Sequence, residues 1–597
     1  MVTRKTNTGL TLLFGLEFLS PITYSIMAYE MDVVQRMVYF SLSILLFFAF
    51  ILKLNLDREV YLNKLLTLLI IFFPLCFLTA FLNDSASLLT LKYSDLLIPF
   101  VIILQSTIVF LVLGEDRFFK VVSYSVVIFS TLFSIVGMLE VFQVKLIELP
   151  TVMPPGSMLG HRGFASEYLL SALPFFLIAH QYVERKNRKF LLIAAVFCVS
   201  FLLFTRSRAG VLILLVITIS YFIYTFFKTD KKKFFNKIKP VLIVLAASLL
   251  FSFIPSKVGE RPDLKSTAET FFDTEFKSNK LRLNFWDASF KMIQEKPLVG
   301  FGLYKWSGYY PGYNGEYFDD KTLLLVHNVH AHNDFLEIFA ESGVIAVVIF
   351  FLIYFFLLIQ LYQKSKHNEK YFALLLTVLT AFLFSFVSFP NYKFASIFHI
   401  GVVSGVALVS SGEKIKNIFC FKFAHLKLLL FITLIFGIVI SFIKIKSEIR
   451  YGEAIFLKDR RQYLLMNQKL DQVSEIFYPF DTSRQPLDYY RGIANSYLGR
   501  HSDALRNNLH GLTLAPFNPI LMNNAAASYQ ELGKSKESIK MFETIKKNFP
   551  NYLGAQFRLL EIYLSEGQTE QAEKLYNELR KKSPGNPSLE RFKNHFQ

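Results

Sequence analysis

Cysteine is scarce in this sequence of 597 residues, which contains only three. Cys76, Cys198 and Cys420 fall in or beside strongly apolar stretches, so a disulfide framework is not expected. A cleavage site is missing as well. Arg4 and Lys5 precede the first apolar stretch, but no small-residue cleavage site follows it. We therefore expect this stretch to be kept as a membrane anchor.

Apolar residues, in contrast, are abundant. Hydrophobic residues make up 53% of the chain, 66 residues are Phe, and the mean hydropathy is +0.39, which is more apolar than a soluble domain requires. About thirteen apolar runs are long enough to cross a bilayer as helices. We expect an all-α protein that begins with a polytopic membrane bundle of about 12–13 spans. The expected spans are 10–28, 34–52, 62–82, 96–113, 119–142, 164–183, 190–204, 210–227, 241–253, 335–362, 371–389, 394–410 and 428–443.

Lysine and arginine cluster in every second loop between the expected spans. Cationic loops stay in the cytoplasm, so we expect the N-terminus inside and, with an odd number of spans, the C-terminus outside. The net charge of +18 then reflects topology, and no nucleic-acid partner is expected, because such binding needs a basic face on a soluble domain. The clusters are Lys53, Arg58 and Lys64; Arg185, Lys186, Arg188 and Lys189; Lys228, Lys231, Lys232, Lys233, Lys237 and Lys239; Lys364, Lys366 and Lys370; and Lys414, Lys416, Lys422 and Lys427.

The chain after the last span carries a repeat with a period of 34 residues, the signature of tetratricopeptide repeats. We expect a membrane domain at 1–446 with a large outer loop at 256–331, a helical connector at 447–488, and an extracytoplasmic α-solenoid of repeats at 489–597. The solenoid is either a structural cap or a surface for a protein partner. The register is set by Gly499, Gly533 and Gly567, by Pro516, Pro550 and Pro584, and by Ala504, Ser538 and Ala572.

Polar groups gather at three outward-facing places, and such groups often mark function in membrane proteins. In "FTRSRAG", Arg206 and Arg208 stand on the outer side, against the trend of cationic inner loops. An anionic ligand is expected beside them. In the alternative interpretation these arginines have no role in catalysis or substrate binding and only contact lipid phosphates.

The second place is "LRLNFWDASFKMIQEKPLVGFGLYKW" in the large outer loop. Arg282 opens an amphipathic helix that suits the membrane surface, and two glycines in "PLVGFG" permit a tight turn after it. The apolar residues that recur at helical intervals are Leu283, Trp286, Phe290 and Ile293.

The third place is "HNVHAHNDFLEIFAESGVIAVVIF", which begins at His327. Asn333 is expected to cap the helix of the following span, and Glu337 lies in its first turn, where the helix dipole favours negative charge. His332 then sits at the mouth of the membrane domain. Two other interpretations stay open: Glu337 and Glu341 serve only as dipole or ion partners, or His330 and His332 ligate a metal with Asp334.

The stretch 282–346, with "RLNFW", "PLVGFG" and "HNDFLEIFAESGVIA", resembles the O-antigen ligase and polymerase superfamily of bacterial polytopic glycan transferases. That family has a His-Asn pair followed, after nine intervening residues, by Gly, and here the three are His332, Asn333 and Gly343. The third residue after this glycine is usually Gly, Thr or Tyr in the family, whereas here it is Ala346.

Two further turns resemble the same family. "SRAG" at 207–210 is similar to the family's arginine-bearing turn, which favours Arg208 over Arg206. "LGHRGFASEYL" at 159–169 is similar to a glycine and asparagine turn before a span, although Arg162 and Gly163 stand where asparagine is expected. The departure leaves the roles of His161 and Arg162 open.

The resemblance implies transfer of a glycan from a polyprenyl diphosphate to an acceptor hydroxyl on the outer face of the bacterial cytoplasmic membrane. The residues suit this chemistry: the guanidinium groups of Arg208 and Arg282 match diphosphate oxygens without a metal or other cofactor, and His332 is expected to be the base. A single displacement would invert the anomeric carbon. Further residues expected to bind substrate are Arg206, Asn333, Glu337, Glu341, His330, His161 and Arg162.

The acceptor is expected to be lipid A core or another surface acceptor. Protein Ser or Thr, and a growing polysaccharide, are the alternatives within the same superfamily. Outside it, a metal-dependent transferase would use paired acids such as Glu30 and Asp32 in the first outer loop. A lipid-linked glycan transporter would need broken helices or internal symmetry, neither of which the sequence indicates. A scaffold would not explain the outer arginines and His332.

Overall fold

The computed structural model describes residues 4–25, 31–54, 59–61, 64–83, 89–149, 152–258, 277–323, 328–410 and 420–596. The structure of these residues is almost entirely helical, as expected for an all-α fold. The α-helices are α1 (Arg4–Leu16), α2 (Met31–Ala49), α3 (Lys64–Leu82), α4 (Leu89–Leu113), α5 (Glu115–Val141), α6 (Arg162–Ala172), α7 (Pro174–Tyr182), α8 (Arg188–Phe204), α9 (Arg208–Lys228), α10 (Lys231–Ser252), α12 (Lys277–Glu295), α13 (Trp306–Tyr313), α14 (Asp334–Ser365), α15 (Lys370–Phe384), α16 (Phe394–Ser410), α17 (Phe423–Asp459), α18 (Tyr463–Leu470), α19 (Leu487–Tyr497), α20 (His501–Leu514), α21 (Pro519–Glu531), α22 (Ser535–Asn548), α23 (Leu553–Ser565), α24 (Thr569–Lys582) and α25 (Pro587–Glu590).

Short elements complete this part of the chain. Two strands, β1 and β2, form a small antiparallel pair. The other short elements are 3-10 helices. The strands and 3-10 helices are β1 (Glu59–Tyr61), β2 (Cys420–Lys422), η1 (Glu17–Ile22), η2 (Ile51–Lys53), η4 (Ser157–Leu159), η5 (Arg185–Asn187), η6 (Gly315–Tyr317), η8 (Pro390–Tyr392) and η9 (Lys593–His595).

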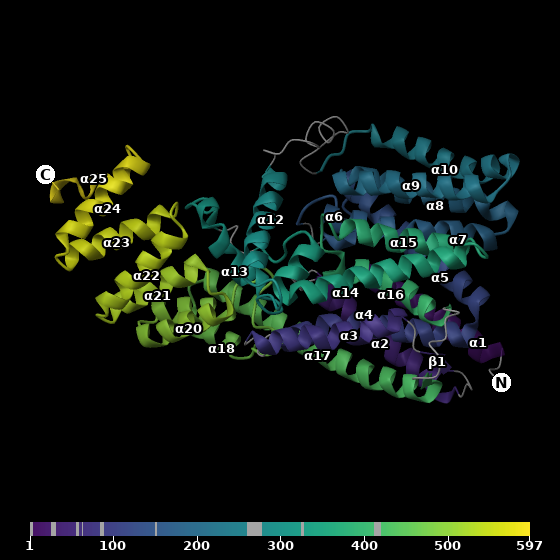
Figure 1. Cartoon of the computed structure of the whole chain (residues 1–597), viewed down its shortest axis with the longest axis horizontal. Helices are drawn as coiled ribbons and strands as arrows, with labels where there is room; N and C mark the ends of the chain where they lie inside the picture. Colours follow the sequence, from purple (N-terminus) through teal and green to yellow (C-terminus); the bar gives the residue numbers. More distant parts are fainter. Residues whose placement is uncertain are drawn as a thin grey trace.

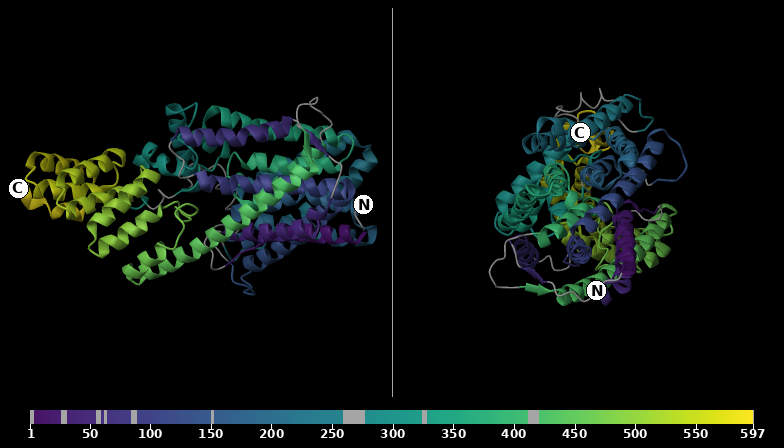
Figure 2. Two further views of the ribbon diagram at one scale, coloured as in Figure 1. Left: turned by 90° about the horizontal axis from the view of Figure 1, so that it is seen from below. Right: turned by 90° about the vertical axis from the view of Figure 1, so that its right-hand side faces the viewer.

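The molecule is elongated, with the membrane helices and the N-terminus at one end and the repeat helices and the C-terminus at the other (Figure 1). Within the described residues, eight helices are long and apolar enough to cross a membrane, and five shorter apolar helices accompany them. Viewed from below, α17 runs from the bundle toward the repeats (Figure 2). It continues without interruption past residue 446, where the boundary of the membrane domain was predicted.

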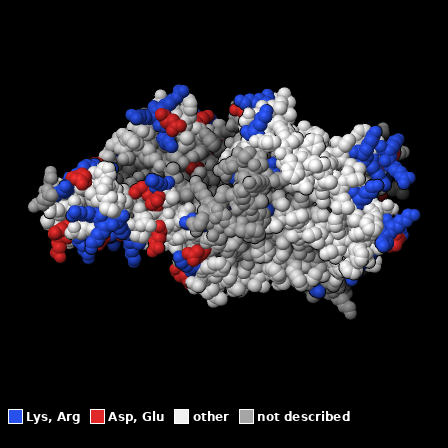
Figure 3. Space-filling model, turned by 90° about the horizontal axis from the view of Figure 1, so that it is seen from above, with Lys and Arg blue, Asp and Glu red and all other residues white. Residues whose placement is uncertain are grey.

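Charge is distributed as a membrane-spanning bundle requires. On the face drawn in Figure 3, a broad band over the bundle lacks charged side chains, and Lys and Arg gather at the end away from the repeats. Loops at that end are tied together by ion pairs: Lys237 Nζ lies 2.5 Å from Glu369 Oε2, and Lys370 Nζ lies 2.8 Å from Asp116 Oδ1. Arg58, Lys414 and Lys416 of the predicted basic loops lie outside the described residues.

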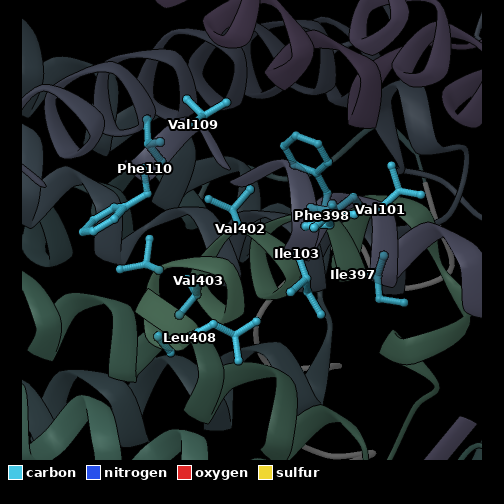
Figure 4. Close-up of a cluster of buried hydrophobic side chains, with 14 of the residues drawn as sticks. Val101, Ile103, Val109, Phe110, Ile397, Phe398, Val402, Val403 and Leu408 are labelled. Atoms are coloured by element: carbon cyan, nitrogen blue, oxygen red, sulfur yellow. The ribbon is translucent and has the colours of Figure 1, made fainter. Parts of the chain in front are cut away.

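The core of the bundle forms where α4 and α16 pack along their length (Figure 4). Their close approach depends on Gly405, because a Cβ added there would lie 2.7 Å from the carbonyl oxygen of Ile103. Thr107 Oγ1 donates a hydrogen bond of 3.2 Å to the carbonyl of Gly405 across this contact. Apolar side chains fill the rest of the interface, among them Val101, Val109, Phe110, Phe398 and Val402.

One expected span is broken. α14 covers the predicted span 335–362, but Gly343 within it has φ 79° and ψ −179°, which is not helical. The backbone of the "PLVGFG" segment fills the break: Phe301 N donates to Ala340 O at 2.9 Å and Gly302 N donates to Glu341 O at 2.8 Å. The expectation of unbroken spans is therefore wrong here. The break is packed with protein backbone, whereas the half-helix ends of transporters face a substrate cavity.

The predicted span 164–183 is also divided, into α6 and α7, where Pro174 begins the second helix. A proline lacks the N–H donor that would continue the hydrogen bonds of the helix, which explains the interruption at this point.

An outer layer of α12 and α13 lies between the bundle and the repeats, with α12 crossing the end of the bundle (Figure 1). The buried face of α12 carries Phe285, Ala288 and Met292, which pack with Trp306 of α13. Of the four apolar residues expected on its membrane-facing side, Leu283 and Phe290 are about half exposed, at 48% and 53%. Trp286 and Ile293 instead pack inward with the same cluster.

The repeats form three successive helix pairs, from α19 to α24, and their turn glycines Gly499, Gly533 and Gly567 have φ of 71°, 68° and 68°. Their sequence signature is thereby confirmed. The repeats also bond to α13 and η6, which precede them in the same chain. Phe517 N donates to Gly308 O at 3.2 Å, and Asn551 Nδ2 donates to Glu316 O at 2.6 Å.

Replacing Gly343 with Ala tests the role of the break in α14. A Cβ at this position would lie 2.0 Å from the carbonyl oxygen of Leu298, and φ is positive. Gly114→Ala is the matched control, because Gly114 has a similar φ of 76° and no described atom within 4 Å of an added Cβ. In both positions φ is positive and ψ is near 180°, a region that is essentially restricted to glycine, so both variants carry a backbone penalty of about 1–3 kcal/mol. We expect Gly343→Ala to lower the thermal midpoint of the detergent-solubilised protein clearly more than Gly114→Ala; equal losses would contradict the packed break.

Candidate functional site

The backbone at His332 is held in an unusual conformation. Its φ of 54° lies in the left-handed region, which is costly for a residue with a Cβ. Hydrogen bonds fix both sides of it. Ala331 N donates to Glu337 Oε2 at 2.8 Å, and Ala331 O accepts from Trp286 Nε1 at 3.1 Å. Asp334 N donates to Ser385 O at 2.8 Å. Such over-determined strain is typical of functional sites.

The ring of His332 lies between two aromatic rings. It is parallel to Phe285 of α12 at 6.1 Å and meets the edge of Phe389 at 5.0 Å. Among the described residues, no hydrogen-bond partner reaches its buried Nδ1 atom. Burial, followed by the charges of Arg282, His330 and His161, holds the pKa of His332 well below 6.5. The imidazole is therefore neutral at neutral pH.

His330 and Glu337 support this arrangement. His330 Nδ1 lies 2.9 Å from Glu337 Oε1, and its ring stacks on Phe389 at 4.3 Å and on Tyr392 at 4.4 Å. Glu337, one turn into α14, thus holds two consecutive residues before His332 through its two oxygens. Asn333 caps α14, as predicted, by accepting from Leu336 N at 3.0 Å.

His161 precedes α6 and faces the same region. Its Nδ1 accepts from Gly163 N at 3.0 Å as the helix cap, and its ring stacks on Phe164 at 4.4 Å. Burial, followed by the charges of Arg162, Lys393 and Arg282, lowers the pKa of His161 to about 4. Because its Nδ1 caps the helix, His161 contributes an uncharged ring to the lining of the site.

The turn "SRAG" and the start of α12 are joined by Arg208. Its Nη2 donates to Ser278 Oγ at 2.8 Å and to Asn279 Oδ1 at 2.6 Å, one helical turn before Arg282. Ser207 caps α9 by accepting from Gly210 N at 3.2 Å. Arg208 of α9 is therefore bonded to the first turn of α12, the helix that carries Arg282.

Arg206 points elsewhere. Its side chain is 1% exposed, and its Nη2 donates to Ser252 O at 2.9 Å, at the C-terminal end of α10. A cation at this end complements the helix dipole. The structure thus places Arg206 away from His332 and Arg282.

Glu341 lies two turns below the mouth of the site. Its Oε1 accepts from Trp306 N at 3.2 Å, and Trp306 Nε1 donates to Ser289 Oγ at 2.8 Å. Glu341 therefore links α14 to α13, and α13 to α12. This supports the position of Arg282 on α12.

The loop between α15 and α16 contributes residues that the sequence did not indicate. Phe389 separates the rings of His330 and His332, and Lys393 lies over Phe164 at 4.9 Å and near Asp32 at 3.9 Å. Asn391 Nδ2 donates to Asp334 Oδ2 at 2.6 Å. A loop has no periodicity to reveal it, and "SFPNYK" matches no motif that we recognised.

A cavity of about 430 Å³ opens beside these groups. His161, His330, Phe389 and Lys393 line it from the membrane domain. Phe389 also contacts the ring of His332, so one residue of the cavity lining touches the neutral imidazole. The volume lies within the roughly 300–1,000 Å³ that small-molecule sites occupy.

A metal centre finds no support among the described residues, where no three His, Cys, Asp or Glu side chains gather as ligands. His330, one of the expected ligands, is engaged by Glu337. His327 and Glu30 lie outside the described residues, while Asp32 lies 3.9 Å from Arg36 and from Lys393.

Comparison with known proteins agrees with the motifs. Residues 193–351 match the family model described as O-Antigen ligase, and residues 524–552 match that of the tetratricopeptide repeat. No curated protein sequence matches the chain. The chain is similar to one in the crystal structure of the APC/C hetero-tetramer Cut9-Hcn1, at 11% identity over 94% of this chain and 93% of that one, but the TM-score of 0.22 carries no argument. The chain therefore carries a region similar to the O-antigen ligase family within its apolar helical part and a region similar to tetratricopeptide repeats near its C-terminus.

Proposed function

We propose that the protein is a glycosyltransferase that moves a glycan from a polyprenyl diphosphate carrier to an acceptor hydroxyl on the outer face of the bacterial cytoplasmic membrane. The observation that carries this proposal is the neutral His332 beside the cationic Arg282, at the end of a membrane helix and within the matched region 193–351. A base and a cation are the two groups that glycan transfer from a diphosphate requires.

The leaving group is stabilised by arginine. As the bond between the anomeric carbon and the phosphate oxygen breaks, the electron pair stays on the diphosphate, whose negative charge grows. The guanidinium of Arg282 bonds to its oxygens in the bidentate manner that suits phosphate, and Arg208 holds the start of the same helix. No metal takes part in this proposed step.

The incoming hydroxyl is activated by His332. The hydroxyl oxygen attacks the anomeric carbon from the face opposite the diphosphate, and its proton passes to the neutral imidazole. The product is inverted at the anomeric carbon. The parallel ring of Phe285 and the edge of Phe389 keep the imidazole oriented.

The acceptor in this proposal is lipid A core or another surface glycolipid, and the repeats lie on the outer side. Protein Ser or Thr is the alternative acceptor. The repeats give it little support, because part of their surface is covered by α13 and η6 of the same chain.

Replacing His332 with Ala should abolish transfer, with a loss of roughly 100-fold or more for removal of a general base. The measurement is glycan staining of membranes from cells lacking the protein and complemented with either form. His367→Ala is the matched control, because His367 is exposed in the loop between α14 and α15.

Proteinase K treatment of the same membranes identifies the acceptor. A glycan signal that needs His332 and survives protease supports a lipid acceptor, whereas loss of the signal with protease shows a protein acceptor. Full transfer by His332→Ala would remove the assignment of the base.

The pH dependence follows from the lowered pKa of His332. In the free enzyme the imidazole stays neutral, so kcat/KM for the donor should remain level from about pH 8 to about pH 6 and fall only on further acidification. The bound diphosphate adds negative charge beside the imidazole and raises its pKa. The acid limb of kcat should therefore lie at higher pH than that of kcat/KM. A limb of kcat/KM centred near pH 6.5 would contradict a buried, neutral His332.

Arg282 should act on the donor. Arg282→Ala removes the guanidinium that faces the diphosphate, and we expect kcat/KM to fall at least 100-fold, with partial recovery in Arg282→Lys, which keeps the charge but not the bidentate geometry. Steady-state kinetics on the purified protein provide the measurement. Arg185→Ala, in the exposed loop between α7 and α8, is the control. Equal activity of Arg282→Ala and the control would exclude this role.

A further inference from the structure

Part of the lining of the cavity beside His330 comes from outside the membrane domain. The segment between α18 and α19, which leads into the repeats, places residues 477–478 and 480–484 against the cavity. The membrane domain contributes His161, His330 and Lys393. The membrane domain and the segment that leads into the repeats therefore line the cavity together.

The tip of this segment is a rigid loop, residues 481–485. Asp481 Oδ1 accepts from Ser483 N at 2.8 Å and from Gln485 N at 2.9 Å. Its Oδ2 accepts from Tyr490 OH of the first repeat helix at 2.6 Å and from Tyr451 OH of α17 at 3.1 Å. The loop is thus fixed to both the long membrane helix and the solenoid.

The first helix of the second repeat unit, α21, also bonds to this loop. Asn518, the cap of α21, donates through Nδ2 to Gln485 Oε1 at 2.8 Å, and both residues are buried. The position of the loop over the cavity is therefore set by the first two repeat units.

Arg484 is presented to the cavity by this loop. Its φ of 61° is in the left-handed region, and its guanidinium lies 4.3 Å from the ring centre of Tyr304, which itself has a φ of 60°. Two strained residues thus meet on the cavity wall, as is usual where function fixes the backbone. Arg484 shares the cavity lining with His161 and His330. The charge of Arg282 acts on His161 as well as on His332.

The cavity carries an excess of positive charge. The carboxylate of Asp481 accepts four hydrogen bonds from its own loop and from tyrosines, which leaves it little capacity to bind a ligand. A cation-rich, aromatic-walled cavity suits an anionic carbohydrate. The charged residues of the lining are Arg36, Lys393, Lys444 and Arg484 against Asp32 and Asp481.

We propose that the loop 481–485 is part of the substrate site and that Arg484 is a specificity-determining residue, which binds an acidic group, a carboxylate or a phosphate, on the glycan of the donor. The proposal rests on the proposed function, since the glycan must extend from the anomeric carbon near His332 into the cavity. By holding this loop, the repeat domain then helps the same chain to select its glycan, in addition to binding any partner.

The test compares two donors on the purified full-length protein: a polyprenyl diphosphate carrying a disaccharide with a uronic acid, and the same donor with the neutral sugar in its place. Arg484→Ala should raise KM for the acidic donor about 10-fold, as expected for loss of a charged hydrogen bond, with little change in kcat. KM for the neutral donor should stay the same, and Arg484→Lys should recover part of the difference.

Two controls are needed. The first distinguishes binding of the glycan by Arg484 from a purely structural role of its loop, and the second distinguishes contact with the glycan from contact with the diphosphate. Arg491→Ala loosens the same segment, because Arg491 bonds to Glu475 at 2.5 Å and to Leu470 O at 3.0 Å, but it does not line the cavity. It should leave the preference between donors unchanged. Sugar-free polyprenyl diphosphate, used as a competitive inhibitor, should keep the same inhibition constant in wild type and Arg484→Ala.

The proposal is overturned if Arg491→Ala reproduces the effect, if both donors lose affinity equally, if the inhibition constant of the sugar-free carrier rises, or if only the KM of the acceptor changes. Failure of the wild-type protein to transfer from either donor would instead count against the proposed function. The two failures are thus distinguishable.

Discussion

The site depends on a break in one membrane helix and on the backbone that fills it. At the boundary of the hydrocarbon layer, every backbone N–H and C=O needs a partner. Gly343 interrupts α14, and the segment 297–302 supplies the missing partners: Phe301 and Gly302 donate to Ala340 and Glu341, while Val344 donates to Pro297. These bonds fix the end of α12 to the membrane helix that carries His332 at its start.

Two consequences follow from this attachment. Arg282 and Phe285 lie on α12, so their distance from His332 is set by the packed break at its C-terminal end and by Arg208 at its N-terminal end. The strained backbone of His332 is in turn held by Glu337 and Trp286. Catalytic groups gain from such preorganisation, because no reorganisation is then needed as charge develops. The low pKa of His332 has the same origin, since the surrounding packing excludes water.

The sequence predicted those features that repeat or that follow local rules. Apolar runs located the spans, the 34-residue period located the repeats, and Asn333 was recognised as a helix cap from its position before an acidic first turn. The family resemblance favoured Arg208 over Arg206, which stays a prediction; in the structure Arg208 bonds to Ser278 of α12 and Arg206 bonds to Ser252 of α10. The break at Gly343 escaped prediction because an apolar run looks the same whether its helix is continuous or divided.

Other parts of the site could not be predicted because they depend on tertiary contacts. Phe389 and Lys393 come from a loop that follows the family-matched region. The lowered pKa of His332 results from burial between helices distant in sequence. Arg484 lies about 150 residues after His330, and only the folded chain brings both to the walls of one cavity. Sequence periodicity reports which face of an element is buried, but not which distant element covers it.

The contacts of the repeats change how this domain is understood. A solenoid usually presents a free concave surface to partners, and the sequence alone suggested that use. Here Gly308 and Glu316 of the outer layer bond to the repeats, and Tyr490 and Asn518 of the repeats fix the loop that bears Arg484. The repeats thus bond to the outer layer and also to the loop that lines the cavity. Displacement of the repeats would therefore open the cavity. Membrane domain and repeats therefore form one structural unit around the cavity, and the chemistry on one side of it is tied to the folding of the other.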